Sequence, residues 1–263
     1  MPAYLDNIIA AHRALAADDH RDPDELMARA AASPAPRPFT EALVAAGSPT
    51  RLAVISEIKR RSPSKGDLDL DLDPASVAKE YESGGAACLS ILTDREFFGG
   101  SPPDLEAARS ACTIPVLRKD FTVSVADVCD ARLMGADAVL LIVAALTGPE
   151  LSVFLSVADQ LSLAALVEVH DGDELGQAIG AGASLIGVNQ RDLHTFEVDH
   201  RLAVSLRPSF PSGVVAVAES GIRGVEDAAR LAAAGYDAVL VGETLVRSGD
   251  RRAAVAELVG AHS

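Results

Sequence analysis

The sequence predicts an α/β fold, a (β/α)8 or TIM barrel that follows an N-terminal helical extension. From about residue 50 onward, short apolar strands alternate with amphipathic helical stretches. A unit in which a glycine ends a helix and a strand follows recurs at 135–141, 182–188 and 235–241. Because such a barrel needs about 250 residues, we expect a single domain over residues 1–263, of which 1–50 form the extension.

Eight segments have the length and composition of buried strands, and helical patterns lie between them. The expected strands are 52–59, 86–93, 114–119, 138–143, 164–169, 185–188, 214–218 and 238–242. The expected helices are 74–83, 124–134, 149–160, 172–180, 200–206 and 225–233. In the extension, residues 1–19 form an Ala-rich, charged helical pattern, and Pro34, Pro36 and Pro38 make a stiff break between its helices.

The alternative fold is an open, doubly wound sheet. That fold would place a Gly-x-Gly-x-x-Gly loop after its first strand to bind a nucleotide. None of the expected strands is followed by this pattern. The sequence therefore favours the barrel.

Composition restricts the compartment and the partners. The core must be aliphatic, since 49% of residues are hydrophobic but only 4% aromatic. Cys88, Cys112 and Cys129 match neither a disulfide framework nor a zinc site, which suits a reducing cytoplasm. The longest apolar run, 136–146, is too short to cross a bilayer, and residues 1–19 lack the apolar core of a signal peptide. The net charge of −15 argues against a nucleic-acid partner, and we expect a cytoplasmic monomer without membrane contact.

The segment 54–66, Val-Ile-Ser-Glu-Ile-Lys-Arg-Arg-Ser-Pro-Ser-Lys-Gly, is the most informative part of the chain. Glu57 and Lys59 are two residues apart, so they project to the same side of a strand. Only 4 of the 23 basic residues are Lys, and three of these, Lys59, Lys65 and Lys119, lie in strand-end motifs. Because Lys can release a proton and Arg cannot, this distribution favours chemistry over a structural ion pair.

Polar residues collect at the expected carboxyl ends of the strands, where barrels carry their active sites. They are Glu57, Lys59, Ser62, Lys119, Glu168, Asn189, Arg191, Glu219, Ser220 and Glu243. The fourth strand offers only apolar side chains such as Leu140, which would line a hydrophobic pocket. The last two loops, 220–224 and 242–244, carry glycines at the start of helices. They are candidate phosphate sites because backbone N–H groups converge there, although turn geometry alone also explains a glycine.

Several of these positions also have structural interpretations. Asp120 and Asp192 closely follow strands, and capping of turns is the favoured role for both. His170 and His194 have no partner at metal-ligand spacing, and Glu219 could bind its neighbouring loop instead of a substrate. Glu168 ends an apolar strand with no local counter-charge, which favours a catalytic role.

In their order along the chain, these motifs resemble the indole-3-glycerol phosphate synthase family over nearly the whole length. The resemblance rests on the motifs at 37–39, 57–66, 117–121, 136–142, 166–170, 187–193, 219–222 and 241–243. Cys129 and Gln190 depart from the family pattern, at positions that the family does not use for chemistry.

The resemblance implies closure of 1-(2-carboxyphenylamino)-1-deoxyribulose 5-phosphate to indole-3-glycerol phosphate, with loss of CO₂ and water and without a metal or cofactor. It assigns proton donation to Lys119, and dehydration to Glu168, Glu57 and Lys59 with their roles left open. A second cation near Lys119 would lower its pKa and ease donation. The implied binding residues are Asn189, Ser62 and Arg191 for the anthranilate group, Ser220, Gly221, Gly242 and Glu243 for phosphate, and Phe98, Phe121, Leu140 and Leu166 for an apolar wall.

Three alternatives remain open at this point. Phosphoribosylanthranilate isomerase is disfavoured, because an isomerisation would be expected to use a Cys or Asp pair where this chain has Glu57, Lys59 and Glu168. A non-catalytic barrel that binds a sugar phosphate would be expected to lack at least one acid or base. A paralogue with the same chemistry in a specialised pathway cannot be separated by sequence.

Overall fold

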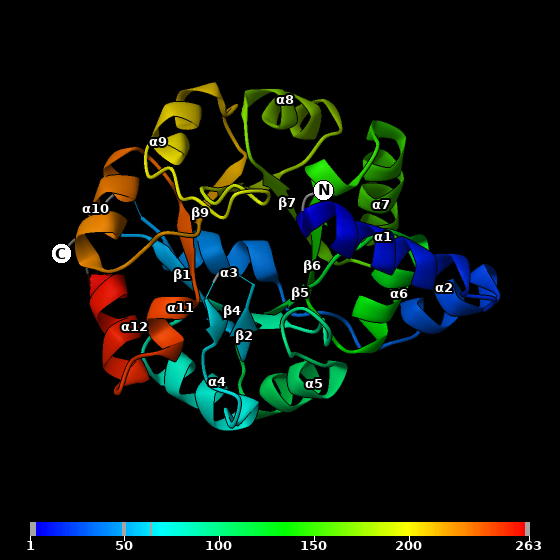
Figure 1. Ribbon diagram of the computed structural model, residues 1–263, viewed down its shortest axis with the longest axis horizontal. Coiled ribbons are helices and arrows are strands. Elements are labelled where there is room, and N and C mark those ends of the chain that lie inside the picture. Colours follow the sequence, from blue (N-terminus) through cyan, green and yellow to red (C-terminus); the bar gives the residue numbers. More distant parts are fainter. Residues whose placement is uncertain (1–3, 49–50, 64, 261–263) are drawn as a thin grey trace.

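The computed structural model describes residues 4–48, 51–63 and 65–260. Eight parallel strands close into a barrel in the order β1-β10-β9-β8-β7-β6-β5-β4, surrounded by helices (Figure 1). These strands are β1 Ala53–Ile58, β4 Cys88–Leu92, β5 Val116–Lys119, β6 Ala138–Ile142, β7 Ala164–Val169, β8 Leu185–Asn189, β9 Val215–Glu219 and β10 Ala238–Val241. The predicted (β/α)8 barrel is confirmed, with strand ends within about two residues of those expected.

The helices follow the strands in alternating order, and those at 102–111, 243–246 and 251–260 were not among the six expected. They are α4 Pro74–Ser83, α5 Pro102–Ala111, α6 Val125–Leu133, α7 Gly148–Gln160, α8 Gly172–Gly180, α9 Leu202–Leu206, α10 Val225–Ala233, α11 Glu243–Val246 and α12 Arg251–Gly260. Side chains cap several N-termini, as Asp171 does for α8 and Ser124 does for α6. A short hairpin, β2 Arg61–Ser62 and β3 Gly66–Asp67, was not predicted; Pro63 and Gly66 belong to this hairpin instead of simply ending a strand.

Alternation along the strands decides which residues reach the site. Successive side chains of a strand point to opposite faces, and one apolar cluster fills the barrel interior while another lies between strands and helices. Ile55, Leu117, Leu166, Leu185 and Val217 belong to the interior cluster. The residue two positions after each therefore also faces inward. These residues are Glu57, Lys119, Glu168, Gly187 and Glu219.

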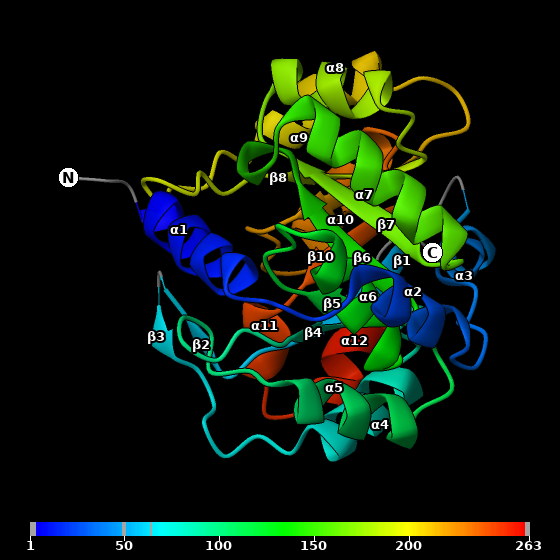
Figure 2. The same cartoon turned by 90° about the vertical axis from the view of Figure 1, so that its right-hand side faces the viewer.

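The N-terminal segment contacts both ends of the barrel. It contains α1 Tyr4–Ala17, α2 Pro23–Ala31 and α3 Phe39–Ala46. Figure 2 shows α1 at the same end as the β2–β3 hairpin and α3 at the opposite end. Phe39 and Leu43 of α3 join the interior cluster, so this helix closes the amino end of the barrel. Buried Asp137 holds the segment before α3 by accepting a hydrogen bond of 2.7 Å from the Arg37 backbone N–H.

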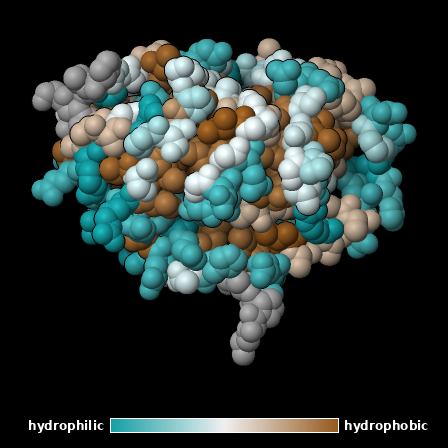
Figure 3. Space-filling view, turned by 90° about the horizontal axis from the view of Figure 1, so that it is seen from above, coloured by the Kyte–Doolittle hydropathy of each residue, from teal (hydrophilic) through white to brown (hydrophobic). Residues whose placement is uncertain are grey.

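Figure 3 shows apolar side chains interspersed with polar ones across one face of the molecule. Within the described ranges, no helix is both long enough and apolar enough to cross a membrane.

Candidate active site

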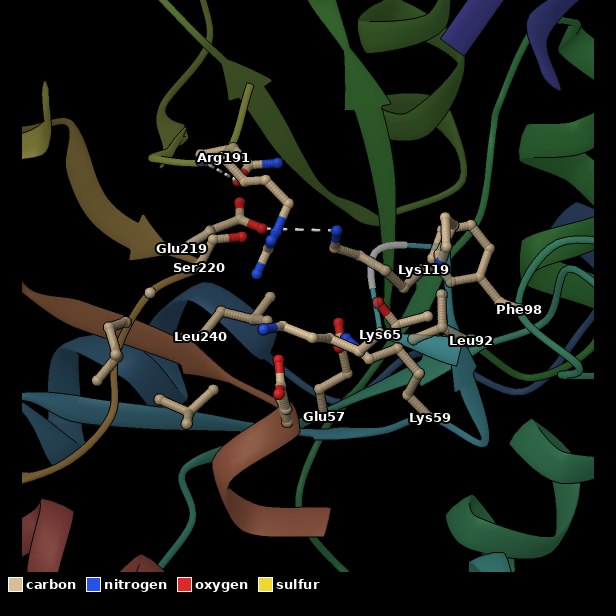
Figure 4. A pocket seen from close by; sticks show the side chains of 18 of the residues that line it. Glu57, Lys59, Lys65, Leu92, Phe98, Lys119, Arg191, Glu219, Ser220 and Leu240 are labelled. Atoms are coloured by element: carbon tan, nitrogen blue, oxygen red, sulfur yellow. Dashed lines mark hydrogen bonds and ion pairs between the residues drawn. The ribbon is translucent and has the colours of Figure 1, made fainter. Parts of the chain in front are cut away.

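A cavity of about 620 Å³ opens at the carboxyl ends of the strands (Figure 4). Among the residues that line it are Glu57, Lys59, Ser62, Phe98, Lys119, Phe121, Leu140, Glu168, Asn189, Arg191, Ser220, Gly221, Gly242 and Glu243. Of the predicted site residues, Leu166 is the exception. It is fully buried in the barrel interior beneath the cavity and does not form part of the wall.

Lys119 occupies the centre of the cavity and contacts two carboxylates. Its Nζ lies 3.1 Å from Glu168 Oε2 and 3.6 Å from Glu219 Oε2, and Figure 4 shows the lysine directed toward Glu219. Asn189 Nδ2 donates a 3.0 Å hydrogen bond to Glu168 Oε1. We call Lys119, Glu168, Asn189 and Glu219 the central cluster; its members come from β5, β7, β8 and β9.

The electrostatics of the central cluster contradict one expectation. Burial would lower the pKa of Lys119, but the carboxylates of Glu168, Glu219 and Glu57 outweigh it and raise that pKa. The expectation that a second cation lowers the pKa of Lys119 is therefore wrong for the free protein. Lys59 Nζ is instead paired with Glu57 Oε1 at 2.6 Å.

The two carboxylates of the central cluster have opposite pKa shifts. Burial would raise the pKa of Glu168, but Lys119, His170 and Asn189 hold it well below its usual value. Glu168 thus has counter-charges that the sequence did not reveal. Burial and the Glu168 charge raise the pKa of Glu219 to about 8, although Lys119 opposes them. Such a pair, with one carboxylate ionised and the other protonated, suits acid–base work.

Glycines make room for these carboxylates. A Cβ atom at Gly187 would overlap Glu219 Oε1 and approach Leu166 Cδ1 to 3.2 Å. A Cβ atom at Gly242 would overlap Glu57 Oε1 and lie 3.2 Å from Glu57 Cβ. Both glycines therefore permit a close approach that a side chain would prevent.

The loop after β9 has an unusual backbone on the side of the cavity opposite Phe98. Ser220 and Gly221 have φ angles of 64° and 73°, in the left-handed region. Gln190 Nε2 donates a 2.8 Å hydrogen bond to the Ser220 carbonyl oxygen and fixes this conformation. Gln190, a departure from the family pattern, thus supports the candidate phosphate loop.

Arg191 extends into the cavity from the loop after β8 (Figure 4). Its Nη1 donates a 3.0 Å hydrogen bond to the Phe196 carbonyl oxygen. Its backbone N–H donates to Asn189 Oδ1 at 3.1 Å, which links it to the central cluster. Asp192 caps the same loop by accepting hydrogen bonds from His194 and Thr195, in agreement with its expected structural role.

Helix α1 contacts the loops that carry Phe98 and Phe121 of the apolar wall. The sequence did not predict this contact. His12 Nε2 lies 3.0 Å from Asp94 Oδ2 and 4.0 Å from Asp120 Oδ1. Its ring lies 5.3 Å from that of Phe121. Asp94 also accepts hydrogen bonds from the Phe97 and Phe98 backbone N–H groups. The loops that carry the aromatic side chains are thereby tied to the N-terminal helix.

We expect the His12 pair to stabilise the fold in a limited pH window. Burial lowers the pKa of His12, but Asp94 and Asp120 outweigh it and raise that pKa above 6.5. The stabilisation is therefore complete below pH 6.5 and is lost as pH rises through the folded pKa. His12→Gln should lower the free energy of unfolding by about 1–2 kcal/mol at pH 5–6, and by less above pH 8. Urea unfolding across this range measures the difference, with exposed His20→Gln as the control; equal losses at pH 5.5 and 9 would contradict it.

His12, Asp94 and Asp120 are also the candidate metal ligands among the described residues. Their ligand atoms lie within 4.8 Å of one another. However, Asp120 already accepts hydrogen bonds from Arg118 Nη2 and the Phe121 backbone N–H. Asp94 also has protein partners, which are described above. Because protein donors already satisfy both carboxylates, we assign no metal to these three residues.

The sequence placed Glu219 at a strand end but assigned it no role in the site. It gave Glu219 a contact with its neighbouring loop as one interpretation, whereas the carboxylate lies in the cavity beside Lys119. The signal that identifies Glu219 as a site residue is its position in the sequence, two residues after the inward-facing Val217.

Comparisons with known proteins show the family of the chain. The family model for indole-3-glycerol phosphate synthase matches residues 5–258. The chain is 50% identical over 262 residues to the indole-3-glycerol phosphate synthase of Mycolicibacterium vanbaalenii, covering 98% of this chain and 95% of that one. It is 49% identical over 257 residues to the synthase of Mycobacteroides abscessus, covering 98% and 94%.

A solved structure supports the fold. Thiamine phosphate pyrophosphorylase from Pyrococcus furiosus aligns with a TM-score of 0.60 at 18% identity, covering 81% of this chain and 96% of that chain. At this identity the likeness concerns the barrel alone.

Proposed function

Because the chain belongs to the indole-3-glycerol phosphate synthase family, we propose that the central cluster carries out the decarboxylating ring closure that defines these enzymes. The substrate is 1-(2-carboxyphenylamino)-1-deoxyribulose 5-phosphate, and the products are indole-3-glycerol phosphate, CO₂ and water. The observation that carries the assignment is the position of Lys119 Nζ, 3.1 Å from Glu168 Oε2 at the centre of the cavity.

Lys119 is the acid of ring closure in this proposal. The aromatic carbon that bears the carboxylate attacks the substrate carbonyl carbon, and negative charge develops on the carbonyl oxygen. Lys119 donates a proton to that oxygen as the bond forms. A raised lysine pKa does not prevent donation, because an alkoxide is a far stronger base than an amine. The ammonium also attracts the oxygen before transfer, in a site largely shielded from water.

Dehydration follows the loss of CO₂. The hydroxyl group formed in the first step leaves as water with an added proton, and the carbon next to nitrogen loses a proton. Glu57, Lys59 and Glu168 are placed to share these transfers, since all three line the cavity. Asn189 orients Glu168 through its 3.0 Å hydrogen bond.

We assign the two sides of the cavity to the two ends of the substrate. Ser62 and Arg191 hold the anthranilate group against Phe98, Phe121 and Leu140. Backbone N–H groups of Ser220, Gly221, Gly242 and Glu243 hold the phosphate. Folding the substrate over this apolar wall brings the reacting carbons together, which lowers the barrier of ring closure.

The phosphate assignment predicts different results for two neighbouring substitutions. Ser220→Ala keeps the backbone donors and should change the substrate KM by less than about threefold. Gly221→Ala places a Cβ 2.5 Å from Val198 Cγ1 at a φ of 73°, so it should raise KM strongly. Steady-state kinetics and the Kd for inorganic phosphate measure both. A large KM increase in Ser220→Ala would show that the side chain itself binds the phosphate.

The decisive experiment for the function is turnover of the synthetic substrate by the purified chain. Indole fluorescence should rise in a metal-chelating buffer, since we propose that the reaction needs neither metal nor cofactor. Binding without turnover would favour a sugar-phosphate sensor, and the absence of both would refute the substrate assignment.

We further propose a monomeric, single-domain enzyme of the cytoplasm without nucleic-acid partners, which light scattering and fractionation would test.

A further inference from the structure

His170 lies directly behind the central cluster and contacts carboxylates on both sides. Its Nε2 is 3.3 Å from Glu168 Oε1, an ion-pair distance without hydrogen-bond alignment, and its Nδ1 is 3.1 Å from Glu174 Oε2. Its backbone N–H donates a 2.8 Å hydrogen bond to the same Glu174 oxygen. The side chain is 14% exposed. The sequence disfavoured a catalytic role for His170, because no metal partner lies at ligand spacing.

Local sequence fixes this arrangement. His170 follows β7, and Asp171 begins α8 by accepting a hydrogen bond of 2.8 Å from the Glu174 backbone N–H. The capped first turn of α8 therefore holds Glu174 against the imidazole ring. His170 is thus positioned by a rigid helix start, which limits its freedom to turn away from Glu168.

The surroundings keep the imidazole charged. Burial would lower the pKa of His170, but Glu168 on β7 and Glu174 on α8 outweigh it and raise the pKa to about 10. Beyond Glu168 lie the other members of the central cluster, Lys119, Asn189 and Glu219. Glu168 therefore lies between two cations, with the Lys119 ammonium at Oε2 and the His170 imidazolium at Oε1.

The proposed reaction needs more protons than Lys119 holds. The substrate carboxylate leaves as CO₂, so each turnover consumes one proton overall. The departing oxygen gains two protons, one during ring closure and one during dehydration, and only one is returned from the carbon next to nitrogen. A second proton must therefore reach the departing hydroxyl while the substrate still occupies the cavity.

We propose that His170 is a positioning residue that holds Glu168 and supplies it with this second proton. This inference rests on the proposed function. Once Lys119 has given up its proton, Glu168 loses one of its two counter-charges and becomes more basic. The Nε2–H bond of His170 then breaks and an O–H bond forms on Glu168, which leaves a neutral imidazole and a carboxylic acid facing the cavity. That acid protonates the departing hydroxyl; the proton from carbon and one solvent proton restore Lys119 and His170.

The first test is the charge state of His170 in the free, full-length protein. In ¹⁵N-labelled protein, side-chain ¹H–¹⁵N correlation spectra report the tautomer and titration of each of the 6 histidines. His170→Gln identifies its signals. We expect His170 to remain an imidazolium at pH 8. A neutral ring at pH 7 would overturn the proposal without bearing on the function of the enzyme.

The second test separates proton supply from a structural role. His170→Gln and His170→Ala should each lower kcat by about tenfold or more while changing KM less than about threefold. Added imidazole should restore kcat of His170→Ala in proportion to its concentration and should leave the wild type and exposed His20→Gln unchanged. Near-normal kcat in His170→Gln, or loss of activity that imidazole does not restore, would overturn the inference. An inactive wild type would instead refute the proposed function.

Discussion

Lys119→Arg is expected to lower kcat about a thousandfold and to leave substrate affinity within a few-fold of the wild type. The guanidinium keeps the positive charge between Glu168 and Glu219, but it does not release a proton near neutral pH. General acid catalysis accounts for roughly 10²–10⁴ in rate, so loss of the transferable proton should appear in kcat and spare KM. Stopped-flow binding and steady-state turnover, measured on the same preparation, separate the two quantities.

The matched control is Lys79→Arg. Lys79 is exposed on α4, away from the residues that line the cavity, so this variant should behave as the wild type. If Lys119→Arg kept near-normal turnover, the acid role would have to move to another group. If it lost binding as severely as turnover, the guanidinium would instead be distorting the site.

Gly187→Ala is expected to lower kcat about a hundredfold and to destabilise the fold by about 1–3 kcal/mol. The added methyl group would occupy the space of the Glu219 carboxylate and press on Leu166. Both neighbours are buried, at 1% and 0% exposure, so neither can move into solvent. Displacement of Glu219 would also disturb Lys119, which lies 3.6 Å away.

Gly176→Ala is the control for this second prediction. Gly176 is exposed within α8 and has no atom within 4 Å of an added Cβ, so Ala should stabilise the helix by up to about 1 kcal/mol. Chemical denaturation and kcat measured on both variants test the comparison. Wild-type turnover in Gly187→Ala would mean that Glu219 has another place to lie, or that its position does not matter.

The arrangement of strands was predictable because local patterns determine it. Apolar runs, helix caps and glycines that end helices before strands specify the units, and period-two alternation then turns Glu57, Lys119 and Glu168 inward. Right-handed βαβ connections leave few ways to join such units. Most of the predicted cavity lining follows from these rules, together with the resemblance to a known family.

Contacts between distant segments were not predictable. The partner of Lys119 depends on how β5, β7 and β9 meet after closure, and Glu168 and Glu219 lie 49 and 100 positions further along the chain. The expected pKa of Lys119 was wrong for this reason. The docking of His12 beside Asp94, 82 positions away, was likewise invisible, since a lone histidine on a helix carries no signal of its partner.

The pairing of β1 with β10 has a consequence for synthesis of the protein. Ala53 is the register partner of Ala238, so the sheet cannot close until residue 238 has left the ribosome. Before then, β1 and the strand synthesised last have unpaired N–H and C=O groups on open edges of the sheet, where other chains can add. Premature termination before residue 238 would therefore yield an aggregation-prone fragment and not a smaller barrel. Such sequence-distant pairing also slows folding, which makes the nascent chain a natural client of chaperones.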